Sequence, residues 1–182
     1  MTTATPGKSS TLLYGVLYGV ASIALTVILY LGGVEFWMSP VSYLGIALPF
    51  VFAFFTAAQL KKQQGGYLEF ADSLKAIFKV MVVGLLLSMI FDYILLNYID
   101  VAFNQALMQA TAQEMERKMV EKKIPQEQID EMMDKMGNAD KYTFALQALA
   151  FAIRCILHFV VALIVSAIMK RKRPVFENTF NH

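Results

Sequence analysis

Four long runs of apolar residues, almost free of charge, dominate this 182-residue sequence. No charged side chain occurs between Lys8 and Glu35, and none between Glu35 and Lys61. Overall, 57% of the residues are hydrophobic and 16% are charged, whereas soluble domains carry about 25% charged residues. A helix of about 20 apolar residues is long enough to cross the hydrocarbon core of a bilayer. The sequence therefore predicts an all-α, polytopic membrane protein.

We expect one membrane domain over residues 1–182, with spans at about residues 11–34, 41–60, 74–99 and 142–169. A cleaved signal peptide is the alternative for the first run, but this run exceeds the usual apolar region of about 7–15 residues. Pro49 lies inside the second span and is expected to bend it, because proline removes a backbone donor.

The segment between the third and fourth runs is polar and has helical spacing. It is rich in Glu, Lys and Gln, and Pro125 and Gly137 are expected to begin and end its second helix. We therefore expect a helical hairpin over residues 104–140.

Charge is distributed unevenly on the two sides of these spans. With both termini and the connection after the second span on one side, that side carries nine bases and three acids, and the other carries six bases and ten acids. Basic residues concentrate on the cytoplasmic side of membrane proteins. We therefore expect cytoplasmic termini and an extracytoplasmic hairpin.

Several short segments resemble the bacterial domain-of-unknown-function family 4199. They are Tyr14-Gly15, Gly65-Gly66-Tyr67, Ile99-Asp100, the IPQEQI segment at 124–129, and the LIVSAI segment at 163–168 before a basic tail. The similarity extends from about residue 12 to 173, and one departure is Val101, where relatives carry proline. The resemblance implies a four-span protein of a Gram-negative inner membrane, without an assigned activity.

Deep inside the predicted spans lie three candidates for chemistry, namely Asp92, Arg154 and His158. A charged group in a span is unfavourable by about 2.5–3.5 kcal/mol on insertion scales, so each one needs an explanation. The depths of Asp92 and Arg154 favour a buried pair, with His158 on the same helix face as Arg154. Such a pair fixes helix register in one interpretation and forms part of a proton or anion relay in the other.

Other features predict packing and contact surfaces. Gly15 and Gly19 form a small-xxx-small pair that allows close helix approach, within the bundle or between copies in a homo-oligomer. Methionines of the hairpin offer an adaptable surface for a membrane or periplasmic protein partner, in preference to a Cu(I) site. They are Met115, Met119, Met132, Met133 and Met136. The basic tail acts in topology and lipid contact, through Lys170, Arg171, Lys172 and Arg173.

The sequence holds none of the common catalytic or nucleotide-binding motifs. A net charge of +2 and a single cysteine argue against a nucleic-acid binder and a disulfide-stapled module. Haem ligation by His158 lacks a partner ligand. We expect no metal, no cofactor and no enzyme activity. A scaffold or accessory subunit is the first interpretation, and a small-solute, ion or proton carrier is the second.

Overall fold

The computed structural model describes residues 8–138 and 144–171, and these residues are helical apart from connecting turns and one antiparallel bridge between Leu68 and Arg171. The helices are α1 (Lys8–Leu31), α2 (Gly33–Trp37), η1 (Pro40–Tyr43), α3 (Leu44–Gln63), α4 (Phe70–Ile94), η2 (Leu95–Ile99), α5 (Val101–Glu121), α6 (Gln126–Asn138) and α7 (Phe144–Met169). Four stretches are long and apolar enough to cross a membrane, at Thr11–Leu31, Pro40–Gln63, Phe70–Ile99 and Ala148–Met169. The prediction of an all-α protein with four spans is confirmed.

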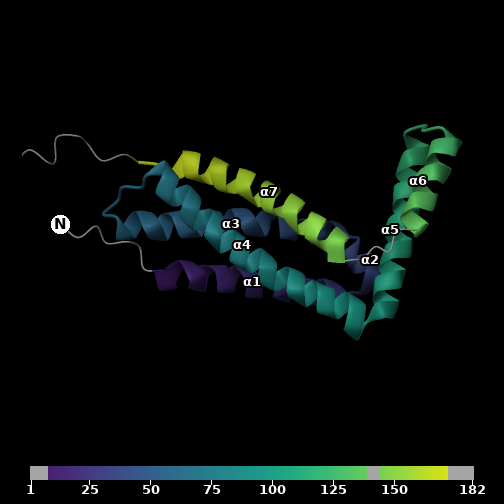
Figure 1. Ribbon diagram of the computed structural model, residues 1–182, viewed down its shortest axis with the longest axis horizontal. Coiled ribbons are helices and arrows are strands. Elements are labelled where there is room, and N and C mark those ends of the chain that lie inside the picture. The colour runs from purple at the N-terminus through teal and green to yellow at the C-terminus, as the bar shows by residue number, and fades with distance from the viewer. Residues whose placement is uncertain (1–7, 139–143, 172–182) are drawn as a thin grey trace, which may run out of the picture.

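The four long helices α1, α3, α4 and α7 run side by side as an elongated bundle (Figure 1). Helix α4 is central, because α1, α3 and α7 all pack against it. The start of α1 and the end of α7 lie at the same end of the bundle, as an even number of spans requires. Helix α5 leaves the opposite end at a steep angle to the bundle, and α6 returns along α5.

Small side chains bring α3 and α7 together against α4. Ala53 and Ala57 of α3 and Ala162 of α7 are fully buried, and they form one cluster with Ile77 and Met81 of α4. Small residues let helix backbones approach closely where lipid supplies no hydrophobic drive for association. This cluster positions the half of the bundle near the chain termini.

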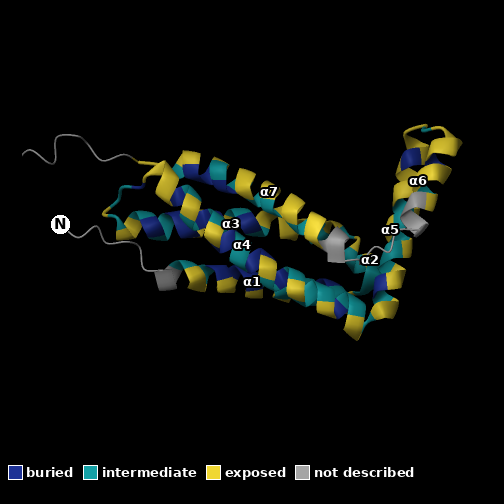
Figure 2. Cartoon of the chain, viewed as in Figure 1, coloured by how far each residue is buried: buried dark blue, intermediate teal, exposed yellow. Residues whose placement is uncertain are grey.

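The outer surface of the bundle is apolar instead of polar. Exposed residues cover the outward sides of the long helices (Figure 2), and on α7 they include Ile156, Leu157 and Ile168. In water such a surface would drive aggregation, whereas in a bilayer it meets acyl chains. The chain is therefore a multi-pass membrane protein.

Several element boundaries differ from those expected. Helix α1 ends at Leu31 and not at residue 34, because Gly33 has a φ of +83°, a conformation that glycine adopts without steric penalty. Helix α6 continues through Gly137 to Asn138, so this glycine does not end the helix, and Pro49 lies inside α3, as the predicted second span requires. The expected span start at residue 142 and hairpin end at residue 140 lie outside the described residues.

Candidate functional site

Hydroxyl-bearing side chains recur every four residues along one side of α1. We call this set the α1 hydroxyl face: Tyr14, Tyr18, Ser22, Thr26 and Tyr30. A spacing of four places residues above one another on a helix. Three of the five hydroxyls hydrogen-bond to another segment of the chain, so this face connects α1 to the polar groups of the bundle.

Tyr18 joins α1 to the other three membrane-spanning helices. Its hydroxyl lies 2.8 Å from Nε2 of His158 on α7. Its ring packs against Phe52 of α3 at a centroid distance of 5.3 Å and lies against Gly84 of α4. The other ring nitrogen of His158, Nδ1, lies 2.7 Å from the carbonyl oxygen of Arg154, which only accepts hydrogen bonds. In the neutral imidazole Nδ1 therefore carries the proton, and Tyr18 donates to Nε2.

Asp92 of α4 accepts a hydrogen bond from the hydroxyl of Thr26, at 3.1 Å. The predicted pair between Asp92 and Arg154 is not a direct contact among the described residues, although the two side chains interact electrostatically. In the described parts of the chain, the ion pairs within 4 Å join Glu114 to Arg117 and Lys118, and none joins Asp92 to Arg154. Asp92 hydrogen-bonds to α1, and Arg154 is exposed on α7.

The predicted small-residue pair, Gly15 and Gly19, lies where α1 crosses α4. An added Cβ on Gly15 would lie 2.8 Å from Cβ of Val83, and one on Gly19 would lie 2.9 Å from Cβ of Leu87. Both glycines therefore act within the bundle, where they hold the α1 hydroxyl face close to α4.

The last residue of the α1 hydroxyl face reaches the start of α5. The hydroxyl of Tyr30 donates to Oδ2 of Asp100 at 2.9 Å, and Oδ1 of Asp100 accepts from the backbone N–H of Phe103 at 2.8 Å. Asp100 is thus the N-cap of α5. The Phe103 ring packs edge-on against Tyr30 and Trp37, which fixes α5 against the α1–α2 corner.

The N-cap of α5 makes the stability of this junction depend on pH. The Phe103 N–H and, after it, the Tyr30 hydroxyl hold the pKa of Asp100 below its usual value. A lowered pKa in the folded protein stabilises it above the unfolded pKa of about 4, and this stabilisation is lost as the pH falls below that value. We expect the thermal midpoint in detergent to fall more steeply below about pH 4 in the wild type than in Asp100→Asn, because asparagine still caps but does not titrate there. Parallel curves for the two proteins would contradict this assignment.

The hydrogen bond between Tyr18 and His158 predicts a second measurable effect. We expect Tyr18→Phe to lower the free energy of unfolding in detergent by about 1 kcal/mol, because it leaves Nε2 of His158 unpaired. Tyr14→Phe is the matched control, since no hydrogen bond from the Tyr14 hydroxyl occurs among the described residues, and its ring contact with Phe55 is retained. If chemical unfolding showed equal effects of the two substitutions, the hydrogen bond between Tyr18 and His158 would contribute nothing to the free energy of unfolding.

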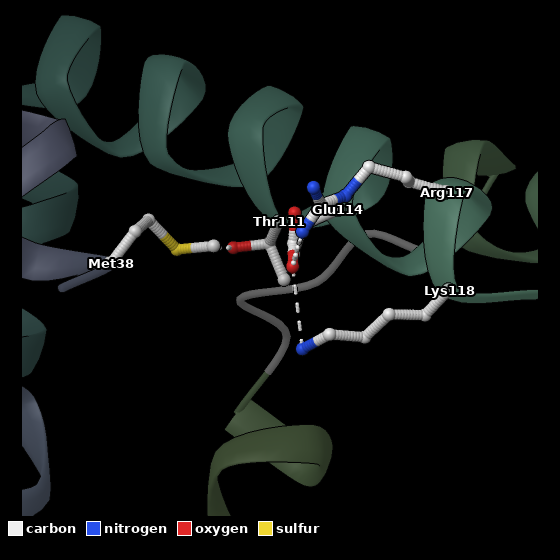
Figure 3. A network of polar contacts seen from close by, with 5 residues as sticks. All are labelled: Met38, Thr111, Glu114, Arg117 and Lys118. Carbon is white, nitrogen blue, oxygen red and sulfur yellow. Dashed lines mark hydrogen bonds and ion pairs between the residues drawn. The ribbon is translucent and has the colours of Figure 1, made fainter. Parts of the chain in front are cut away.

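An open cleft of about 540 Å³ lies between the α2–α3 connection and α5. It is lined by Trp37, Met38, Ser42, Tyr43, Glu114, Arg117 and Lys118. Glu114 lies between the two bases, at 2.7 Å from Nη2 of Arg117 and 3.4 Å from Nζ of Lys118 (Figure 3). The hydrogen bond from Arg117 is the main cause that lowers the pKa of Glu114. The formal charges of the three side chains sum to +1.

The methionines predicted as a contact surface are divided between two environments. Met119 is buried, as is Ile129 of α6, and Met133 is half-buried. Met115 and Met132 are exposed. The side chain of Met136 lies outside the described residues. Within the described ranges, no three His, Cys, Asp or Glu side chains gather closely enough to hold a metal ion.

The basic tail begins at the chain end of α7. Arg171 exchanges two backbone hydrogen bonds with Leu68, at 2.8 and 2.9 Å, and its guanidinium lies 6.0 Å from the centre of the Tyr67 ring. The predicted tail residues Lys172 and Arg173 lie outside the described residues. These contacts tie the connection before α4 to the end of α7.

The fold and its lipid-facing surface define a helical, multi-pass membrane protein. A family model described as "Protein of unknown function (DUF4199)" matches residues 13–171, and the chain belongs to this family. No curated protein and no solved structure matches the chain.

Proposed function

We propose that this protein is a non-enzymatic membrane scaffold or accessory subunit that binds a partner protein through α5 and α6. The observation that carries the proposal is the position of α6. It packs on α5 and lies away from the four bundle helices (Figure 1), so its outward side contributes nothing to the membrane domain.

The exposed side of α6 favours a basic partner. Its exposed acids are Glu127, Asp130, Glu131 and Asp134. Met132 lies among them with 43% of its surface exposed. A negative surface around an adaptable apolar side chain suits a basic helix or strand that carries an apolar residue of its own.

We place the protein in a bacterial inner membrane with both termini in the cytoplasm. The exposed residues Lys62, Lys75, Lys79 and Arg171 lie in the last turn of α3, in the first three turns of α4 and just after α7. Those helix ends lie at the same end of the bundle as the start of α1. The acidic α6 lies at the other end. The positive-inside rule then makes α5 and α6 extracytoplasmic, so the partner is a periplasmic protein or the outer part of another membrane protein.

The test is co-purification of a companion protein from native membranes in mild detergent. We expect the companion to be lost when residues 105–137 are replaced by a flexible linker of equal length. We expect Glu127→Lys with Asp134→Lys to reduce its recovery about tenfold or more, and added salt to do the same, because exposed charges are screened.

The matched control reverses two exposed acids at the opposite end of the bundle, Glu69→Lys with Asp72→Lys, which alters the net charge equally. Recovery of the companion should then be unchanged. A companion that binds all of these variants equally, or binding that does not require residues 105–137, would contradict the proposal.

The α1 hydroxyl face favours a second candidate, a small-solute, ion or proton carrier. Asp92 and His158 both hydrogen-bond to this face, on Thr26 and Tyr18. Titratable groups linked by hydroxyls inside a span mark proton and ion pathways in other membrane proteins. Arg154, one helical turn from His158, adds a cation to the same region.

Flux in proteoliposomes tests this candidate. A carrier should move protons or anions faster than lipid vesicles alone, more slowly in Asp92→Asn, and at the wild-type rate in Asp72→Asn, which removes an exposed acid from the first turn of α4. Identical, leak-level flux in all three proteins would eliminate it.

A further inference from the structure

The cleft between the α2–α3 connection and α5 lies at a boundary of the membrane. Trp37 and Met38 belong to the connection between the first two spans, and Ser42 and Tyr43 lie in the first turn of the second span. Arg117 and Lys118 reach the same cleft from α5, which begins directly after the third span. Lipid phosphates lie at this level, just outside the hydrocarbon core.

The polar wall of the cleft carries unused donors. Arg117 has five N–H donors and Lys118 has three, and the described contact of each is with the single oxygen Oε1 of Glu114. Their side chains are 64% and 61% exposed, so a ligand can reach them. The two bases and one acid that line the cleft leave a charge of +1, which matches one phosphodiester, and Glu121, which interacts electrostatically with Arg117, lies outside the lining.

The other wall of the cleft is apolar and continues along the outside of α3. Tyr43 is 64% exposed, and the exposed side chains of Leu44 and Ile46 follow it. Trp and Tyr rings favour the headgroup level, where one side of the ring is wet and the other is apolar. Basic donors therefore lie next to a surface that suits acyl chains.

We propose that this cleft binds an anionic phospholipid, with the phosphate on Arg117 and Lys118 and the acyl chains along Tyr43, Leu44 and Ile46. Glu114 pairs with both bases and limits the positive charge, so the site suits one phosphate better than a polyanion. The acyl-chain surface favours a lipid headgroup over free phosphate as the source. This binding does not depend on a protein partner of α5 and α6.

Retention of lipid by the full-length protein tests the proposal. The purified protein in detergent is titrated with phosphatidylglycerol or phosphatidylcholine, and bound lipid is counted by native mass spectrometry. We expect phosphatidylglycerol to bind about tenfold or more tightly than phosphatidylcholine, and Arg117→Gln with Lys118→Gln to remove most of this preference, since charge-assisted hydrogen bonds are the strong ones. Equal binding of the two lipids by the wild type would overturn the proposal.

Two further variants separate the site from general surface charge. Lys122→Gln with Lys123→Gln removes the same charge from the exposed end of α5, outside the cleft, and should leave binding unchanged. Glu114→Gln should strengthen binding of phosphatidylglycerol several-fold, because it frees both bases. Loss of binding in the lysine control equal to that of the cleft variant, or no change in Glu114→Gln, would overturn the assignment.

A competition experiment distinguishes the two sources of phosphate. Inorganic phosphate and glycerol 3-phosphate are added at concentrations matching that of the lipid. We expect neither to displace phosphatidylglycerol, because they lack acyl chains for the Tyr43 side of the cleft. Displacement by either at equal concentration would show a site for soluble phosphate and overturn the lipid assignment.

Discussion

Substitution of Gly84 by alanine is expected to lower the free energy of unfolding by about 3 kcal/mol, at the upper end of the usual effect of overpacking. A Cβ at this position would collide with the ring of Tyr18 and lie 2.9 Å from both the carbonyl oxygen of Gly15 and the backbone nitrogen of Gly19. The last two atoms belong to the α1 backbone, so no rotamer change relieves the contact. The two helices must separate, which also moves Tyr18 away from His158.

Gly45 provides the matched control for this prediction. An alanine Cβ there meets its nearest neighbour, Cδ2 of Leu25, at 3.8 Å, which is ordinary van der Waals contact. Gly45→Ala should therefore be neutral or stabilise the helix by up to about 1 kcal/mol through its higher propensity. Chemical unfolding of both variants in the same detergent compares them. Equal stability of Gly84→Ala and Gly45→Ala would show that the α1–α4 crossing is not tightly packed.

The spans could be predicted from the sequence because lipid imposes a length and a composition on any helix that crosses it. The charge-free run that begins after Lys8 became the span Thr11–Leu31. Its end was less predictable, since the charge-free run continues past Leu31 to Glu35. The backbone decides there, at Gly33 with its positive φ.

The candidate site was less predictable from the sequence than the spans, because ionisable residues alone were considered as candidates. Asp92 and His158 stood out as ionisable residues in apolar runs, but Tyr18 and Thr26, which bind them, are uncharged. The four-residue spacing of the α1 hydroxyl face was a signal in the sequence that could have revealed them. The predicted Asp92–Arg154 pair depended on depth along a span, and depth does not indicate which side of the helix each residue occupies.

Neither the hydropathy nor the charges of the sequence could have predicted the cleft. Trp37 and Arg117 are far apart in the sequence, and they lie together because α5 crosses the end of the bundle instead of extending away from it. That angle depends on Asp100 as the N-cap and on the packing of Phe103 against Tyr30 and Trp37. The angle of α5 is set by these tertiary contacts, and the periodicity of the sequence does not reveal them.

Ile129→Asp is expected to detach α6 while the bundle remains folded. Ile129 is 1% exposed and lies on the side of α6 that packs on α5, where Met119 is also buried. A carboxylate buried there without a partner destabilises by several kcal/mol. Helix α6 has 13 residues, and an isolated helix of that length is marginal in water, so it should unfold once its packing is lost.

Hydrogen exchange followed by mass spectrometry should show this as a local change. A loss of about 3 kcal/mol corresponds to exchange about a hundredfold faster over α6. The amides of α4 should keep their protection, since α4 packs on α1, α3 and α7. Met132→Asp is the control, because Met132 is exposed on the same helix. If Ile129→Asp also exposed α4, α6 would be part of the membrane core, and a separate docking role for it would be excluded.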